Sequence, residues 1–308
     1  MPELPDLTIY LDALASRIVG QPLEAIRLAN PFVLRSVAPA TGALVGHRVT
    51  GLRRIGKRLV IELSPYAIAM HLMIAGRLRW LAPKAKIPGR LGLAAFDFPT
   101  GALVLTEAGT KRRASITLLE GEAAIAALDA GGLEISSLDA ATFGARLRQE
   151  RHTLKRTLTD PRLFAGIGNA YSDEILHRAR MSPVKMSTSL KDDEVARLLD
   201  ATQAVMREWI DRLRSETGDR FPEKVTAFRE GMAVHGRYGK PCPDCGTPVQ
   251  RIVHAENETN YCPRCQTEGR ILADRSLSRL LKEDWPRTVE ELEQLGARKS
   301  SHDTPKIA

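Results

Sequence analysis

Residues 241–265 read PCPDCGTPVQRIVHAENETNYCPRC and contain all four cysteines of the chain. The cysteines form two Cys-x2-Cys pairs, Cys242 with Cys245 and Cys262 with Cys265, separated by sixteen residues. Each pair presents two thiolates to one tetrahedral ion, and a sixteen-residue excursion suits a hairpin that returns the second pair to the first. The run from Thr247 to Val253 predicts one strand of that hairpin. We therefore expect one structural Zn²⁺ held by the four cysteines.

Disulfide bonds or a redox-active pair are the alternative interpretation of these cysteines. A cytoplasmic chain rarely keeps disulfides, and redox chemistry does not require two matched pairs. No apolar run approaches the roughly 20 residues that cross a bilayer, and Met1-Pro2-Glu3 lacks the features of a signal peptide. We expect a cytoplasmic protein without a membrane anchor, which favours zinc over disulfides.

The length and charge of the chain limit the remaining possibilities. A chain of 308 residues exceeds what a single hydrophobic core usually serves, so at least two cores are expected. With 43% hydrophobic and 27% charged residues, the composition excludes disordered and collagen-like proteins. The 45 Lys and Arg against 37 Asp and Glu give a formal net charge of +8. This surplus is compatible with a nucleic-acid partner, although many basic proteins only carry solvated surface charge.

The hydrophobic pattern upstream of the cysteines predicts an α+β multidomain protein. A helical pattern at residues 6–19 precedes closely spaced β-like runs that indicate a sandwich, namely Arg58–Leu63, Ala67–Leu72, Arg77–Leu81, Leu93–Phe98, Gly101–Thr106 and Ser115–Leu119. Beyond a Gly- and Ser-containing linker the chain is helical, and its longest helix carries an apolar stripe from Val195 to Leu213. The predicted domains are a β-sandwich (1–119), a linker with connecting helices (120–150), a helical domain (151–232), a zinc finger (233–266) and a C-terminal extension (267–308).

Three local runs together point to one family. They are Met1-Pro2-Glu3-Leu4-Pro5, Gly166-Ile-Gly-Asn169-Ala-Tyr-Ser-Asp-Glu174 and the double cysteine pair. Over about residues 1–266 the chain resembles the formamidopyrimidine-DNA glycosylase and endonuclease VIII family. The resemblance implies an N-terminal β-sandwich, a helix-two-turn-helix domain and a zinc finger, in a DNA glycosylase that is also an AP lyase. The implied partner is double-stranded DNA with damaged bases or abasic sites, and we expect a monomer.

Pro2 has chemistry that suits this activity. Once Met1 is removed, Pro2 becomes a secondary α-amine with a reference pKa near about 8, so roughly a tenth of it is neutral at pH 7. A secondary amine that attacks the sugar C1′ gives an iminium ion, an electron sink that acidifies the neighbouring proton and lets the 3′ phosphate leave. The resemblance implies that Glu3 is the general acid that opens the ribose ring. Taken alone, these two residues would equally suit an ordinary polar terminus.

The resemblance also implies further site residues. Lys57, between two β-like runs, matches a lysine that contacts phosphate near the reacting sugar, and His71 matches a histidine between the sandwich and the DNA. Lys155 matches a basic residue at the start of the helical domain. Asn169 follows a glycine-rich turn, where a helix N-terminus suits a phosphate. Without the resemblance, Lys57 would be a solvated lysine, His71 a core histidine and the turn a simple helix connection.

Two departures from the family concern lesion recognition. Where the family usually carries an arginine, five residues before the third cysteine, this chain has Asn257 between Glu256 and Glu258. Loss of one charge-assisted phosphate contact costs roughly 1 to 3 kcal/mol. A methionine expected two residues beyond His-Leu is replaced by Ile74, and the usual arginine-containing recognition run is absent. Its region carries Arg112 and Arg113, which we expect to contact DNA. The preferred lesion and opposite base therefore stay open.

We expect a base-excision repair enzyme that removes oxidised or ring-opened bases and cleaves the abasic strand by β/δ-elimination. The alternative is a DNA-damage or abasic-site binding protein of the same fold with weak or altered glycosylase activity. A zinc-ribbon module for RNA or protein would explain the cysteines but not the N-terminus. Retention of Pro2 and Glu3 favours the enzyme. In the tail, Leu277, Leu280 and Leu281 suggest a short helix that packs on the helical domain or docks a partner.

Overall fold

The computed structural model of the chain describes residues 1–109, 111–223, 225–254, 257–274, 278–280 and 282–294. Contacts divide it into two compact units. The first comprises residues 1–136, 160–167 and 206–227, and the second comprises 137–159, 168–205 and the chain from 228 onward. Two segments of the expected helical domain therefore group with the β-strands.

The first unit begins with α1 (Leu4–Ile18), close to the expected helix. Leu7, Leu14 and Ile18 recur at helical spacing and are fully buried. Pro5 stands in the first turn, where its missing N–H costs nothing. The Tyr10 hydroxyl accepts a 3.3 Å hydrogen bond from the backbone N–H of Leu78 in the sandwich. These contacts anchor α1 and thereby fix the position of the N-terminus.

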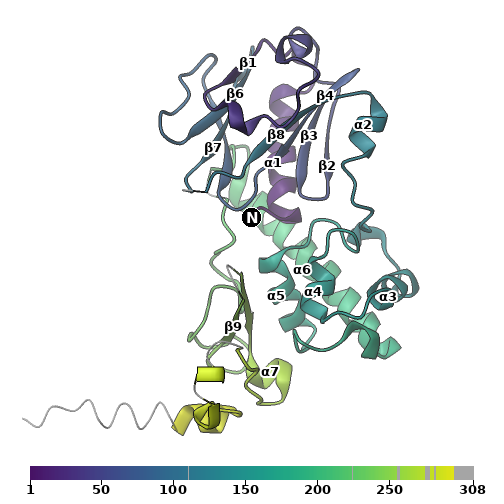
Figure 1. The fold of residues 1–308 in the computed structure, drawn as a ribbon, viewed down its shortest axis with the longest axis vertical. Helices are drawn as coiled ribbons and strands as arrows, with labels where there is room; N and C mark the ends of the chain where they lie inside the picture. The colour runs from purple at the N-terminus through teal and green to yellow at the C-terminus, as the bar shows by residue number, and fades with distance from the viewer. Residues whose placement is uncertain (110, 224, 255–256, 275–277, 281, 295–308) are drawn as a thin grey trace, which may run out of the picture. The chain divides into compact units, whose positions relative to one another are not determined.

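Two four-stranded antiparallel sheets form the predicted sandwich (Figure 1). One sheet has the order β1 (Ala25–Leu28), β6 (Gly92–Phe98), β7 (Gly101–Glu107) and β5 (Gly76–Leu81), and the other has β2 (Gly51–Ile55), β3 (Arg58–Leu63), β4 (Tyr66–His71) and β8 (Ser115–Glu120). The six predicted strands are confirmed within one residue at each end. Strands β1 and β2 were not predicted, because their residues are half-buried throughout and show no alternation.

The start of the predicted linker belongs to the sandwich core. Helix α2 (Glu122–Ala126) places Ile125 in a buried cluster with Val60, Ala67 and Ala69 of the second sheet. This cluster covers one face of the sheet with apolar side chains. Short 3-10 turns elsewhere are η1 (Pro31–Val33), η2 (Thr41–Leu44), η3 (Ile135–Ser137), η4 (Ser187–Ser189) and η5 (Lys282–Asp284).

Helices dominate the first part of the second unit. They are α3 (Ala140–Arg148), α4 (Leu154–Thr159), α5 (Asn169–Arg178) and the first half of α6 (Asp192–Thr217). The acidic first turn of α6 complements the helix dipole. Its predicted apolar stripe is confirmed, since Val195, Leu198 and Val205 are buried.

The second unit ends in the cysteine hairpin and the tail. Strands β9 (Gln250–His254) and β10 (Asn257–Tyr261) pair antiparallel and are followed by α7 (Pro263–Thr267). The first strand begins at Gln250 and not at Thr247, because Pro248 has no N–H for a ladder.

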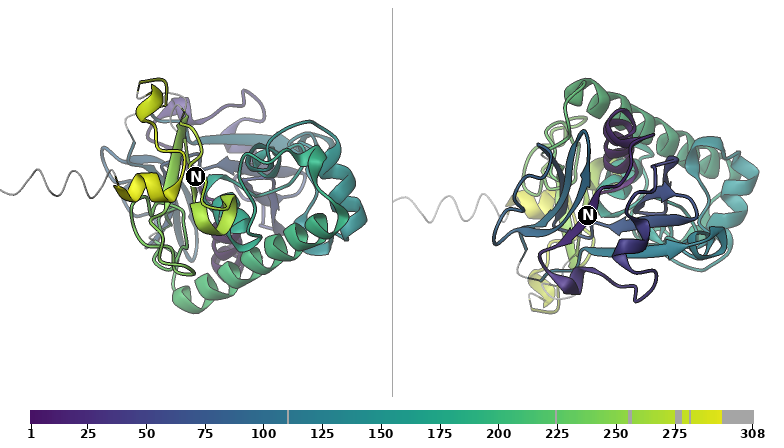
Figure 2. Two further views of the ribbon diagram at one scale, coloured as in Figure 1. Left: turned by 90° about the horizontal axis from the view of Figure 1, so that it is seen from below. Right: turned by 90° about the horizontal axis from the view of Figure 1, so that it is seen from above.

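Residues of the described part of the tail form hydrogen bonds with this hairpin. Val253 N–H donates to Asp274 Oδ2 at 2.7 Å, and Leu272 N–H donates to Tyr261 Oη at 2.7 Å. Figure 2 shows the tail beside the hairpin in the left-hand view. Residues 278–280 are helical and Leu280 is exposed, whereas Leu277 and Leu281 lie outside the described residues. Within the described ranges no helix has both the length and the apolar character that a membrane crossing requires.

Candidate active site and zinc centre

The N-terminal motif is buried at the beginning of α1. Pro2 is buried, and Glu3 is 2% exposed and caps the helix. The backbone N–H of Glu3 donates to Asp6 Oδ2 at 2.9 Å, and that of Leu4 donates to the carbonyl of Gly166 at 2.9 Å. The structure thus brings the first glycine of the Gly-x-Gly turn to the N-terminal motif.

Gly166 makes this approach feasible. Its φ is +81°, which disfavours L side chains, and an added Cβ would lie 2.8 Å from the Leu4 Cβ. A bulkier residue would therefore displace the start of α1. Gly166 thus joins the glycine-rich turn to the N-terminus.

Four charged groups act on the terminal amine, here that of Met1. Its pKa is lowered, chiefly by burial, and the cations Arg77 and Lys57 lower it further, whereas Glu3 and Asp6 raise it. Lys57, in the turn between β2 and β3, is therefore close enough to act electrostatically on the terminus. Arg77 was not predicted as a site residue, because it lies in β5 and no sequence spacing relates it to the N-terminus.

His71 ends strand β4, where it pairs with Arg58 on β3 and Ser115 on β8. Burial first, then Arg58 and Lys57, lower its pKa to about 4. The imidazole is therefore neutral near pH 7 and has one N–H donor and one acceptor nitrogen. Because the side chain is only partly buried, it is not an enclosed core histidine.

The loop after β7 holds Arg112 and Arg113. The buried Glu107 carboxylate accepts backbone N–H bonds of 3.0 to 3.1 Å from Arg113 and Ala114, which shape the loop. Both arginine side chains are exposed, and Arg112 Nη2 donates to the Arg90 carbonyl at 2.6 Å. Ile74, at the departure noted above, is 54% exposed and follows Met73, whose φ is +51°.

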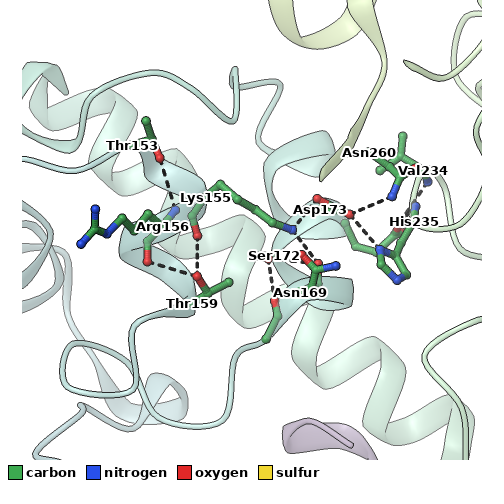
Figure 3. A network of polar contacts seen from close by, with 12 residues as sticks. Thr153, Lys155, Arg156, Thr159, Asn169, Ser172, Asp173, Val234, His235 and Asn260 are labelled. Atoms are coloured by element: carbon green, nitrogen blue, oxygen red, sulfur yellow. Dashed lines mark hydrogen bonds and ion pairs between the residues drawn. The ribbon is translucent and has the colours of Figure 1, made fainter. Parts of the chain in front are cut away.

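In the second unit, Lys155 joins a buried network centred on Asp173 (Figure 3). Lys155 Nζ donates to Asp173 Oδ1 at 2.5 Å and to the Asn169 carbonyl at 2.6 Å. Asp173 Oδ2 meets His235 Nδ1 at 2.8 Å and accepts from Asn260 Nδ2 at 3.3 Å. Two of the three ammonium protons of Lys155 are thus used within the protein. Asn169 begins α5, as expected for a residue at a helix N-terminus, and DNA contact by either residue stays a prediction.

Glu174 organises the segment that follows α6. Its carboxylate accepts backbone N–H bonds from Ala233 at 2.7 Å, Val234 at 3.0 Å and His235 at 2.9 Å. Burial raises the pKa of Glu174, and the three N–H donors oppose that rise. Asp173 and Glu174 stood in the quoted motif without an assigned role. Apart from Lys155, which is 18 residues from Asp173, the partners of these two carboxylates are 59 to 87 residues away in sequence, a separation that local patterns do not reveal.

The four cysteines fit a tetrahedral zinc ion. Their Sγ atoms lie within 4.8 Å of one another, with Cys242 to Cys265 at 3.9 Å and Cys245 to Cys262 at 3.4 Å. Zn–S bonds of about 2.3 Å give a tetrahedron edge of about 3.8 Å. None of the four is in a disulfide. Burial raises the pKa of Cys265 to about 12, so a bound cation is needed to hold it as a thiolate. A complete set of four sulfurs indicates a structural site.

Asn257 begins β10 opposite His254, at the tip of the hairpin. Its neighbour Glu258 is paired with Arg251 at 2.7 Å, and the Arg251 guanidinium lies 4.3 Å from the centre of the Tyr238 ring. Glu256, the other flanking acid, lies outside the described residues. Arg251 therefore partly neutralises Glu258, which weakens the repulsion between this carboxylate and a phosphate at the tip.

Comparisons with known proteins match this architecture part by part. Family models match residues 1–115 (formamidopyrimidine-DNA glycosylase N-terminal domain), 133–220 (formamidopyrimidine-DNA glycosylase H2TH domain) and 239–267 (zinc finger found in FPG and IleRS). The formamidopyrimidine-DNA glycosylases of Heliobacterium modesticaldum and Thermus thermophilus are each 33% identical, over 86% and 87% of this chain and 100% of theirs.

Solved structures show the same likeness. A Lactococcus lactis FPG mutant in complex with Fapy-dG containing DNA has a TM-score of 0.75 at 25% identity, over 86% of this chain and all of that one. MutM in complex with carbocyclic 8-oxo-G containing DNA has a TM-score of 0.76 at 26% identity, over the same shares. The predicted fold class and the single structural zinc ion are confirmed. By its domain models, its full-length relatives and its fold, this chain belongs to the formamidopyrimidine-DNA glycosylase family.

Proposed function

We propose that the protein excises oxidised or ring-opened bases from damaged double-stranded DNA through a Schiff base on Pro2, and then cleaves the abasic strand. The surroundings of the N-terminus carry this proposal. A buried carboxylic residue, Glu3, adjoins the terminal amine, whose pKa is lowered by burial, Arg77 and Lys57. We infer that the Pro2 amine, once Met1 is removed, meets the same charged groups, because Pro2 is buried next to Glu3. A lowered pKa increases the neutral fraction of the amine, and the neutral amine is the nucleophile.

The proposed reaction balances without a redox partner. The Pro2 nitrogen attacks C1′, the bond from C1′ to the base breaks, and the base leaves with a proton. Glu3 protonates the ring oxygen, so the ribose opens and an iminium forms between Pro2 and C1′. Loss of a C2′ proton then expels the 3′ phosphate, and a second elimination expels the 5′ phosphate. Water hydrolyses the resulting iminium ion, which releases the sugar remnant and restores the free amine.

Cationic and neutral polar groups near the terminus suit the phosphates of the reacting nucleotide. Lys57 and Arg77 provide positive charge, and together with burial, the larger cause, they lower the pKa of the terminal amine. His71 is neutral near pH 7, because its pKa is about 4, and so offers hydrogen bonds without a charge. Electrostatic stabilisation by such fixed groups is commonly a large part of catalysis.

DNA contacts outside this centre are proposed for Arg112, Arg113, Lys155, Asn169 and the hairpin tip at Asn257. The two arginines are exposed, and the N-terminus of α5 suits a phosphate beside Asn169. Ile74 is exposed on its loop and is proposed to fill the gap left by a flipped base.

Borohydride trapping on abasic-site DNA tests the proposed nucleophile. We compare the protein after Met1 removal with the same protein carrying an uncleaved N-terminal tag, which makes the Pro2 nitrogen an amide. Pro2→Gly is the second variant, and a C-terminally tagged protein is the control. We expect trapping in the processed protein and the control, and its loss in the blocked protein and in Pro2→Gly. Undiminished trapping in the blocked protein would exclude Pro2, and trapping in none would favour the binding-only alternative.

We also propose that the protein acts as a monomer in the cytoplasm, where its net charge of +8 favours association with nucleoid DNA. Size-exclusion chromatography with light scattering should give a mass near 33.9 kDa at micromolar concentration. A mass of twice this value would refute the monomer.

A further inference from the structure

A buried histidine lies against the cysteine cluster. His177 occupies the last turn of α5 and is 4% exposed, and its Nε2 is 3.3 Å from Cys242 Sγ. Asp244 Oδ2 is 4.0 Å from the same nitrogen, too far for a hydrogen bond, and it also faces Arg180 Nη2 at 3.3 Å. The sulfur is therefore the closer partner of this nitrogen.

The zinc-bound state fixes the direction of this hydrogen bond. Cys242 binds zinc as a thiolate, which accepts hydrogen bonds and cannot donate them. His177 Nε2 must then carry the proton and donate it to the sulfur. Four thiolates around one Zn²⁺ leave a net negative charge, so a buried N–H donor stabilises the centre.

Other contacts hold the same helix to the same hairpin. One turn before His177, Asp173 accepts from Asn260 Nδ2 of β10 at 3.3 Å. Just beyond α5, the Met181 carbonyl accepts from Gln266 Nε2 of α7 at 2.9 Å. His177 lies between these contacts along the chain, and its side chain is 5% exposed. Its contact with Cys242 links the helix directly to a zinc ligand.

We propose that His177 is a positioning residue for the zinc centre, whose Nε2–H···Sγ bond to Cys242 slows zinc loss and fixes the hairpin to α5. This role depends on the zinc centre and is independent of the Schiff-base chemistry proposed for Pro2. A failed trapping experiment would therefore leave it untouched.

Zinc release from the full chain tests the proposal. His177→Phe removes the donor but keeps an aromatic ring, whereas His177→Gln keeps an N–H at similar reach. Arg178→Gln changes the exposed neighbour on the same helix and serves as the control. With a chromophoric chelator in excess, we expect zinc to leave His177→Phe about 10 to 100 times faster than the parent, as is typical when an outer-shell partner is lost. The Gln variant and the control should stay close to the parent.

Cobalt substitution separates the hydrogen bond from simple packing. A donor lowers the energy of the sulfur lone pair, so its loss should move the sulfur-to-cobalt charge-transfer band to longer wavelength in His177→Phe but not in His177→Gln. Unchanged release and an unchanged band in His177→Phe would overturn the proposal, as would a Gln variant that loses zinc as fast as the Phe variant. If His177→Phe does not fold, the parent loaded with an NMR-active cadmium isotope decides the matter. A His177 Hε2 proton coupled to the metal is expected, and its absence would refute the hydrogen bond.

Discussion

Replacing Asp173 by asparagine should destabilise α5 strongly, because Asp173 neutralises a cation that has little access to water. The Asp173 side chain is 0% exposed and that of Lys155 is 12% exposed, with 2.5 Å between Oδ1 and Nζ. Removing one partner of a buried pair costs about 3 to 5 kcal/mol, since the other charge stays buried and unpaired. Each loss of about 1.4 kcal/mol raises an equilibrium constant about tenfold. A loss at the lower end of that range therefore raises the equilibrium constant for opening of α5 by more than about 100-fold.

Amide hydrogen exchange of peptides covering residues 169–178 measures this opening in the zinc-loaded protein. We expect Asp173→Asn and Lys155→Met each to accelerate exchange strongly. The double variant should lose less opening free energy than the two single variants lose in sum. The difference should be at least about 1 kcal/mol, because the double variant leaves neither charge of the pair unpaired. Asp192→Asn is the control, since its pair with Arg148 is exposed (96% and 37%) and such pairs contribute at most about 1 kcal/mol.

Strictly additive effects, or normal protection in Asp173→Asn, would refute this account of the network. The same variants bear on the DNA role predicted for Lys155. If Lys155 also contacts a phosphate, Lys155→Met should reduce the salt dependence of DNA binding by about 0.9 in the logarithmic slope. An unchanged slope with reduced helix protection would assign Lys155 a purely structural role.

Three further predictions concern the hairpin and the N-terminus. Asn257→Arg should tighten binding to abasic DNA and steepen the logarithmic salt slope of binding by about 0.9, which a salt titration measures. Equal slopes for the variant and the parent would mean that the hairpin tip does not contact the DNA backbone, or that another basic residue such as Lys111 already contacts that phosphate. Cys262→Ser, or chelation, should release one zinc per chain and weaken DNA binding before the β-sandwich unfolds, because the hairpin has little core of its own; metal analysis near zero for the parent protein would contradict this. Arg77 lowers the pKa of the terminal amine, so Arg77→Gln should raise it and reduce the neutral fraction. The acid limb of the pH profile for borohydride trapping should then move to higher pH, and an unmoved limb would show that Arg77 does not act on the amine.

Much of this protein follows from local sequence patterns. The two Cys-x2-Cys pairs specify a zinc centre because both ligands of each pair come from one short turn. The apolar stripe of α6 and six of the eight sandwich strands are found by periodicity, which records the burial of one face. The N-terminal run and the Gly-x-Gly turn define the family because each carries an unusual chemical or backbone requirement.

Tertiary structure alone decided how these local features combine. Arg77 acts on the terminal amine, Asp173 holds Lys155, and His177 contacts Cys242, yet no spacing in the chain relates these partners. The tail binds the hairpin through Asp274 and a backbone N–H, a contact that its leucine pattern did not suggest. Periodicity shows which face of an element is buried, but it does not show which distant polar group that face will meet. The charges and hydrogen-bond partners that set pKa values and metal retention are fixed by such long-range contacts, and they become visible when the chain is folded.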